Sequence, residues 1–122
     1  MLDNKNAEFL EYLDLSINAS QNITVKLIND NRNDEANHEK VKTNVYQIFK
    51  TVFQTITKQK TLEQEDIKKL FLEKTETIPA NWKTSLESAK TFQDVEKILI
   101  EEIKLQTLEE IRNTFLKIWE RN

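Results

Sequence analysis

Apolar side chains recur every three or four positions along the first part of the chain, which is the spacing of one helix face. Between about Asn6 and Ile28, at ~100° per residue, six of them fall within about a third of the circumference. They are Phe9, Leu10, Leu13, Ile17, Leu27 and Ile28. Ser20 and Thr24 lie in the middle of this face. We expect a helix here, with both hydroxyls bonded to the carbonyl four residues earlier.

The clearest periodic pattern follows a polar turn at residues 29–34 and ends near Thr57. Its apolar positions are Val41, Val45, Ile48, Phe49, Val52 and Ile56. They align along one side of a helix, so we expect Val45, Ile48 and Val52 in the core. Lys58 and Lys60 come next, at the helix end where the backbone dipole favours positive charge.

Start signals predict two shorter helices in the middle of the chain. Thr61 and Gln64 have the spacing of a capping box, in which two side chains bond to each other's backbone N–H groups. Pro79 favours the first turn of the next helix, and Thr91 with Asp94 forms one more start signal. The positions expected to face inward are Ile67, Leu70, Phe71, Trp82, Leu86 and Ala89.

The last segment, from about Phe92 to Trp119, has two apolar stripes. The first comprises Phe92, Val95, Leu99 and Ile103, and the second comprises Leu108, Ile111, Phe115, Ile118 and Trp119. Their centres differ by roughly 145° on a straight helix of ~3.6 residues per turn. Either Thr107 caps a new helix after a break, or one long helix covers two different partners. Residues 101–106 contain no helix breaker, so we favour the continuous helix.

Composition narrows the fold class. The chain has 122 residues, one proline, no glycine and no cysteine. Primed hairpin turns, phosphate-binding loops and dinucleotide fingerprints depend on glycine, which disfavours β-rich and nucleotide-binding α/β folds. Without cysteine there is no disulfide or thiolate metal site. The sequence predicts an all-α, compact bundle of about five helices, four-helix-bundle-like, with a long or broken C-terminal helix, as a single domain over residues 1–122.

The same features indicate where the protein acts. No apolar run approaches the ~20 residues of a membrane span, and the first residues lack a secretory signal. We therefore expect a cytoplasmic protein without a membrane partner. The excess of lysine over arginine, with frequent asparagine and isoleucine, is typical of an AT-rich, bacterial genome.

One pair of residues has a spacing known from metal sites. Glu35 precedes the single histidine, His38, by three residues, which is the spacing of the di-iron bundle motif. A complete site needs two such motifs, so we expect a structural or solvated His38 and no cofactor. A metal-dependent enzyme would require an oligomer that joins several copies of the pair. No nucleophile motif such as Gly-x-Ser-x-Gly occurs, and we expect no enzymatic activity.

The charges and the aromatic residues leave two hypotheses for function. The net charge is −3, and the basic positions Lys58, Lys60, Lys68, Lys69 and Lys74 gather in one segment. Phe115 and Trp119 either clamp the last helix onto the bundle or mark a partner surface. We favour a non-enzymatic binding or regulatory protein that acts through a protein partner or self-association. The alternative is a nucleic-acid-associated regulator that uses the Lys58–Lys74 region.

Overall fold

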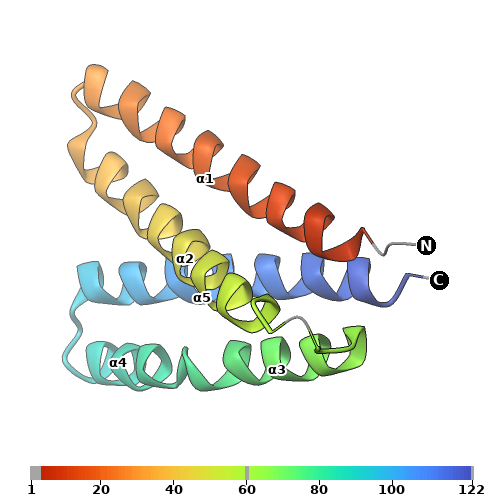
Figure 1. The fold of residues 1–122 in the computed structure, drawn as a ribbon. Helices are drawn as coiled ribbons and strands as arrows, with labels where there is room; N and C mark the ends of the chain where they lie inside the picture. Colours follow the sequence, from red (N-terminus) through yellow and green to blue (C-terminus); the bar gives the residue numbers. More distant parts are fainter. Residues whose placement is uncertain (1–3, 60, 122) are drawn as a thin grey trace.

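The computed structural model describes residues 4–59 and 61–121 and contains five helices in that part of the chain (Figure 1). They are α1 (Lys5–Asn29), α2 (Asn33–Thr57), α3 (Gln64–Thr77), α4 (Ala80–Thr91) and α5 (Val95–Trp119). No strand occurs among the described residues. The predicted all-α bundle is therefore confirmed. Lys60, one of the basic positions considered above, lies outside the described residues.

The five helices are arranged much like a four-helix bundle, because α3 and α4 run end to end beneath α5 (Figure 1). Helix α2 crosses α5, and the hairpin of α1 and α2 diverges from α5 at the end where α5 begins (Figure 1). At the opposite end, the start of α1 and the end of α5 lie together (Figure 1). There the Lys5 ammonium donates to the Trp119 carbonyl at 3.1 Å. The Arg121 guanidinium donates to the Glu8 carboxylate at 2.7 Å.

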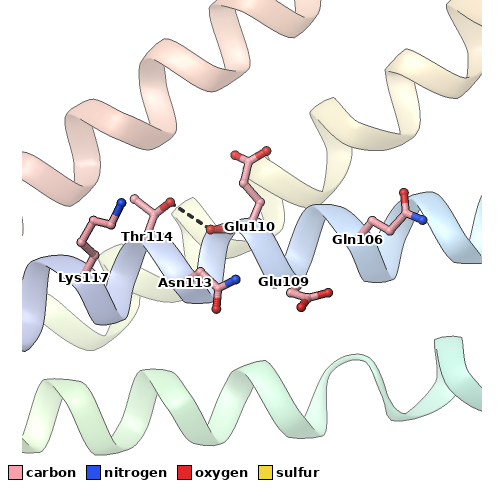
Figure 2. Close-up of a pocket in the computed structure, with 6 residues that line it drawn as sticks. All are labelled: Gln106, Glu109, Glu110, Asn113, Thr114 and Lys117. Carbon is pink, nitrogen blue, oxygen red and sulfur yellow. Dashed lines mark hydrogen bonds between the residues drawn. The ribbon is translucent and has the colours of Figure 1, made fainter.

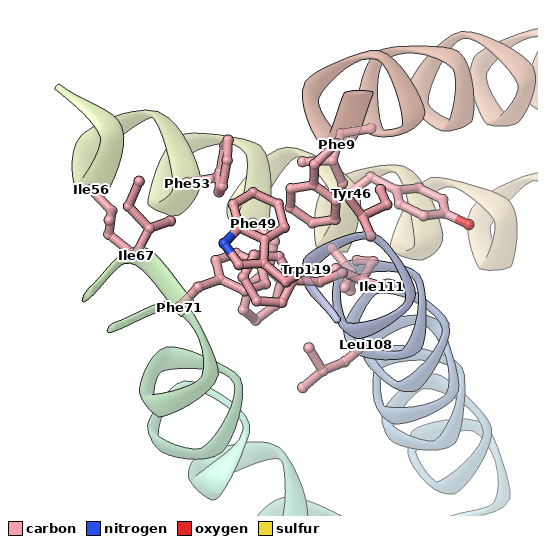
Figure 3. Close-up of a cluster of buried hydrophobic side chains, with 14 of the residues drawn as sticks. Phe9, Tyr46, Phe49, Phe53, Ile56, Ile67, Phe71, Leu108, Ile111 and Trp119 are labelled. Carbon is pink, nitrogen blue, oxygen red and sulfur yellow. The ribbon is translucent and has the colours of Figure 1, made fainter. Parts of the chain in front are cut away.

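The core lies where the second half of α5 meets α1, α2 and α3, and phenylalanine rings fill it (Figure 3). Phe9 packs edge-on against Phe53 and Phe71, with ring centroids 5.0 and 5.2 Å apart. Phe71 in turn lies 4.4 Å from Phe115. Buried aromatic rings dominate the energetics of small cores, so this cluster fixes how the helices pack.

Helix α2 packs with its buried face rotated from the predicted seam. Val45 is buried as expected, but Ile48 keeps 39% of its surface exposed. The expectation that Ile48 belongs to the core is therefore wrong. Tyr46 and Phe53, seven residues apart on the opposite edge of the seam, are buried instead. Large rings gain more from burial than one aliphatic side chain, so they set the rotation of the helix.

Of the two polar residues on the apolar face of α1, Thr24 forms the predicted hydrogen bond and Ser20 does not. The Thr24 hydroxyl donates to the Ser20 carbonyl at 2.9 Å, which is the expected bond to the preceding turn. Ser20 instead reaches across to α2, where its hydroxyl donates to the Glu39 carboxylate at 2.7 Å. It also lies 2.7 Å from the Thr43 hydroxyl. Ile28, expected on the same apolar face, is exposed. It lies near the end of α1, where the α1–α2 hairpin diverges from α5 (Figure 1).

Two helix starts are shifted from their predicted positions. Helix α3 is preceded by Glu63, whose N–H donates to the Asp66 carboxylate at 3.3 Å, so the predicted cap at Thr61 is wrong by two residues. Helix α5 is capped by Asp94, whose carboxylate accepts from a backbone N–H at 3.2 Å. Thr91, predicted as that cap, is the last residue of α4. In both cases a carboxylate, and not the predicted threonine hydroxyl, binds the free backbone N–H groups at the helix start.

Helix α5 is continuous from Val95 to Trp119, as we favoured. Thr107 lies in its middle, where its hydroxyl donates to the Ile103 carbonyl of the preceding turn at 2.8 Å. The alternative, a break with Thr107 as the cap of a new helix, does not occur. Before the helix, Gln93 adopts a left-handed conformation with φ of 55°. This turn is made without glycine, at a conformational cost of roughly 1–2 kcal/mol for an ordinary residue.

Candidate partner-binding surface

Phe115 and Trp119, predicted as partner-binding residues, lie in the core of the chain. Their rings stack with centroids 4.3 Å apart. The Trp119 indole N–H donates to the Gln64 carbonyl at 3.1 Å, which ties the end of α5 to the start of α3. This geometry matches the alternative in which Trp119 clamps the last helix onto the bundle. A partner role for the two residues stays a prediction, because a partner would reach them only if this half of α5 left the core.

The other apolar stripe of α5 points outward. Phe92 at the corner before the helix is 79% exposed, and Val95 and Leu99 on its first two turns are 76% and 39% exposed. We call these three residues the apolar patch. They follow one another at spacings of three and four residues, so Val95 and Leu99 lie on the same side of α5. Neither hairpin α1–α2 nor helix α4 buries them.

The inner side of the same half of α5 is charged. Glu101 is buried, and its carboxylate accepts from the Lys104 ammonium at 2.7 Å. The Lys104 ammonium lies 5.6 Å from the centre of the Trp82 ring on α4, within the range of a cation–π contact. Trp82, expected in the core, is only partly buried at its edge. This half of α5 thus has a buried ion pair on its inner side, beside partly buried apolar residues such as Leu105, while Val95 and Leu99 are exposed on its outer side.

A polar hollow continues the outward side of α5 beyond the apolar patch. It has a volume of about 390 Å³ and is lined by Gln106, Glu109, Glu110, Asn113, Thr114 and Lys117 (Figure 2). We call it the polar groove. Leu99, Gln106, Asn113 and Lys117 are separated by seven, seven and four residues, which places them along one side of a helix. Patch and groove therefore form one continuous outer face of α5.

Two tyrosines hold one carboxylate at the edge of the polar groove. The Tyr46 hydroxyl donates to both carboxylate oxygens of Glu110, at 3.1 and 3.0 Å, and the Tyr12 hydroxyl donates to Oε2. Burial, together with the Glu110 charge and its hydrogen bonds, raises the pKa of both phenols well above the ordinary value. Both therefore remain donors at neutral pH, and they fix the Glu110 carboxylate from α1 and α2. The sequence offered only a weak signal of this cluster, namely one tyrosine on each of two amphipathic helices.

The outer face of α5 has acidic residues next to the apolar patch and along the polar groove. Glu102 lies three residues after Leu99, and Glu109 and Glu110 line the polar groove. Glu102 and Glu109 form no ion pair within the described part of the chain. Lys117 supplies the one positive charge among the residues that line the groove. The acids are positioned to attract a basic group in water-exposed surroundings.

Glu35 and His38 pair with different residues. Glu35 accepts from the Arg32 guanidinium at 2.9 Å, whereas His38 Nε2 lies 2.8 Å from the Glu96 carboxylate of α5. The His38 contact links the start of α2 to the start of α5, where the two helices diverge. Across residues 4–59 and 61–121, no group of three or more histidine, aspartate or glutamate side chains is placed to hold a metal ion.

The basic positions of the second hypothesis lie mainly on α3. Lys68, Lys69 and Lys74 share this helix with four acidic residues. The Lys68 ammonium also pairs with the Glu120 carboxylate at 3.5 Å. Lys58 lies just after the end of α2. A nucleic-acid surface needs a concentrated positive field, and alternating charges on one short helix weaken it.

Comparison with protein-family models, with curated proteins and with solved structures finds no match for this chain. Among the helices that the structure describes, none combines the length and apolar character needed to cross a bilayer.

Proposed function

We propose that this protein is a non-enzymatic binding or regulatory protein that docks a partner protein onto its apolar patch. The observation that carries the proposal is the exposure of Phe92, just before α5, together with Val95 and Leu99 on the outer side of its first two turns. Single exposed apolar residues are normal on protein surfaces. Three exposed apolar residues within one turn and the helix start that follows it, one of them aromatic, are typical of an interface.

Burial of the patch would provide a large part of the energy of binding. Fully burying one large apolar side chain contributes about 1.5–3 kcal/mol. Phe92 and Val95 are mostly exposed in the free protein, so nearly all of that gain remains for a complex. The patch is carried on a rigid helix anchored in the core by Phe115 and Trp119, which lowers the ordering cost of binding.

The nucleic-acid alternative has less support. The net charge of −3, the four acids among the α3 lysines and the acidic outer face of α5 all oppose contact with phosphates. It predicts that nucleic acid copurifies with the protein and is released by salt, which an ultraviolet spectrum detects.

The test compares two double variants as bait in extracts of the cell that makes the protein. Phe92→Ser with Val95→Ser removes the patch. Leu15→Ser with Val25→Ser is the matched control, because these α1 residues are also exposed, by 60% and 55%. We expect the wild type and the control to capture the same protein in stoichiometric amount, and the patch variant to lose it. Equal capture by all three, or capture of nothing, contradicts the proposal.

A measurement of mass in solution completes this test. We expect the purified protein to be a monomer, since the proposed partner is a different protein. A dimer that dissociates on Phe92→Ser with Val95→Ser, but not in the α1 control, would show that a second copy occupies the patch. Circular dichroism of each variant establishes that the fold is intact before binding is compared.

A further inference from the structure

We propose that the partner contributes an amphipathic helix with an apolar end and a basic end, which lies along the outer face of α5. This inference rests on the proposed function and names the chemistry of the partner. Its apolar end would cover Phe92, Val95 and Leu99. Its basic end would occupy the polar groove, beside Glu109 and Glu110.

The length of the outer face fits a helix. From Val95 to Lys117 the face extends for about 33 Å, at ~1.5 Å per residue. The face is unbroken because α5 is continuous over this distance. A partner helix of about six turns would cover it, and helices that dock in this way use apolar anchors at spacings of three, four and seven residues.

The charges on the face specify a basic partner. Glu102 and Glu109 have no ion-pair partner within the described residues, so a lysine or arginine would not have to displace one. Glu110 is held in place by the hydroxyls of Tyr12 and Tyr46, so its carboxylate is already ordered for contact. Neutral phenol donors leave the negative charge of the carboxylate in place. An arginine or lysine at this point would gain a charge-assisted hydrogen bond.

A second copy of this chain fits the face poorly. An antiparallel copy in full register would set the apolar patch of each chain against the acidic groove of the other. A parallel copy would bring Glu102, Glu109 and Glu110 against the same residues of its neighbour, which is unfavourable for like charges. An anionic membrane surface or a nucleic acid meets the same repulsion. The combination of apolar and acidic ends therefore favours a partner with complementary ends.

The test uses two fluorescein-labelled synthetic helices and measures their binding by fluorescence anisotropy. Both have leucines at helical spacing in their first half, and their second half has either lysines or glutamates on the same side. We expect the lysine peptide to bind the full-length protein about tenfold more tightly than the glutamate peptide, a difference of ~1.4 kcal/mol. Added salt should reduce this preference, because Glu109 and Glu110 are exposed.

Variants locate the site. Glu102→Gln with Glu109→Gln should weaken the lysine peptide several-fold and leave the glutamate peptide unweakened. The matched control is Glu73→Gln with Glu76→Gln, which removes two exposed acids from α3 and should change nothing. Equal binding of the two peptides, binding of neither, or equal effects of the two variants would overturn the inference.

The two proposals fail in different ways. If the patch variant loses its cellular partner but the peptides show no preference for lysine, docking on the patch stands and the basic helix is wrong. If the patch variant captures the same proteins as the wild type, the proposed function is wrong whatever the peptides do.

Discussion

The rotation of α2 can be tested with two adjacent residues. Phe49 is fully buried, and its ring centroid lies 6.0 Å from that of Phe71. Phe49→Ala should lower the free energy of unfolding by about 3–5 kcal/mol, because it removes a buried ring and leaves a cavity. Ile48, one position earlier, is 39% exposed, although the sequence pattern places it in the seam. On that pattern alone, Ile48→Ala would cost about 2–5 kcal/mol.

The structure gives a much smaller cost for Ile48→Ala. The substitution removes three carbons; at ~0.8 kcal/mol for each fully buried carbon and about three-fifths burial, the transfer loss is about 1.4 kcal/mol. The site opens to solvent, so no cavity remains. Alanine is the better helix former, which returns ~0.4 kcal/mol and leaves a net loss of about 1 kcal/mol.

Urea unfolding followed by far-UV circular dichroism measures both values, if the two variants unfold with the wild-type slope against denaturant. We expect Phe49→Ala to be at least ~2 kcal/mol less stable than Ile48→Ala. Equal losses, or a larger loss for Ile48→Ala, would refute the rotation of α2 and the aromatic core built on it.

Three further variants test contacts between and within helices, each by urea unfolding. Thr107→Val should change stability by less than ~0.5 kcal/mol, because its hydroxyl shares a carbonyl that keeps its backbone bond; a loss of ~0.5–2 kcal/mol would indicate a cap at a helix break. Ser20→Ala should cost about 1–2 kcal/mol, since it leaves the buried Thr43 hydroxyl without this partner, and an unchanged stability would contradict the bridge. The raised pKa values of Tyr12 and Tyr46 mean that the folded protein favours the protonated phenols. Their contribution to stability is fully present below pH ~10, which is the pKa of an unfolded tyrosine, and it is lost as the pH rises above that value. The double variant Tyr12→Phe with Tyr46→Phe should therefore lose less stability in that alkaline range than the wild type, and equal losses would count against the cluster.

Much of the fold could be predicted because helix periodicity is a local signal. Val45 and Ile67 are buried as their spacing indicates, and the lack of glycine correctly favours helices throughout. The rotation of each helix is less local. Ile48 and Tyr46 are both compatible with a buried face of α2, and only the packing of Phe53 against the other rings decides between them.

Helix starts could be located only within two or three residues. Thr61 and Thr91 have good capping chemistry, yet the helices begin after Glu63 and Asp94. Several polar residues in each turn can satisfy the same backbone N–H groups, so the sequence alone does not select one. The sequence also could not predict the hydrogen-bond partners of Ser20 on α2, because they depend on how α1 and α2 align.

The apolar patch follows from two properties of α5 that were both visible in its sequence. Two stripes about 145° apart on one unbroken helix cannot face the same neighbours. The second stripe contains Phe115 and Trp119, which stack with each other and contact the other rings of the core, so it takes the inner side. The rotation of the whole helix is then fixed, and Val95 and Leu99 must turn outward. A break at Thr107 would have let both stripes enter one core. The exposed apolar face of α5 is therefore a consequence of the continuity of this helix.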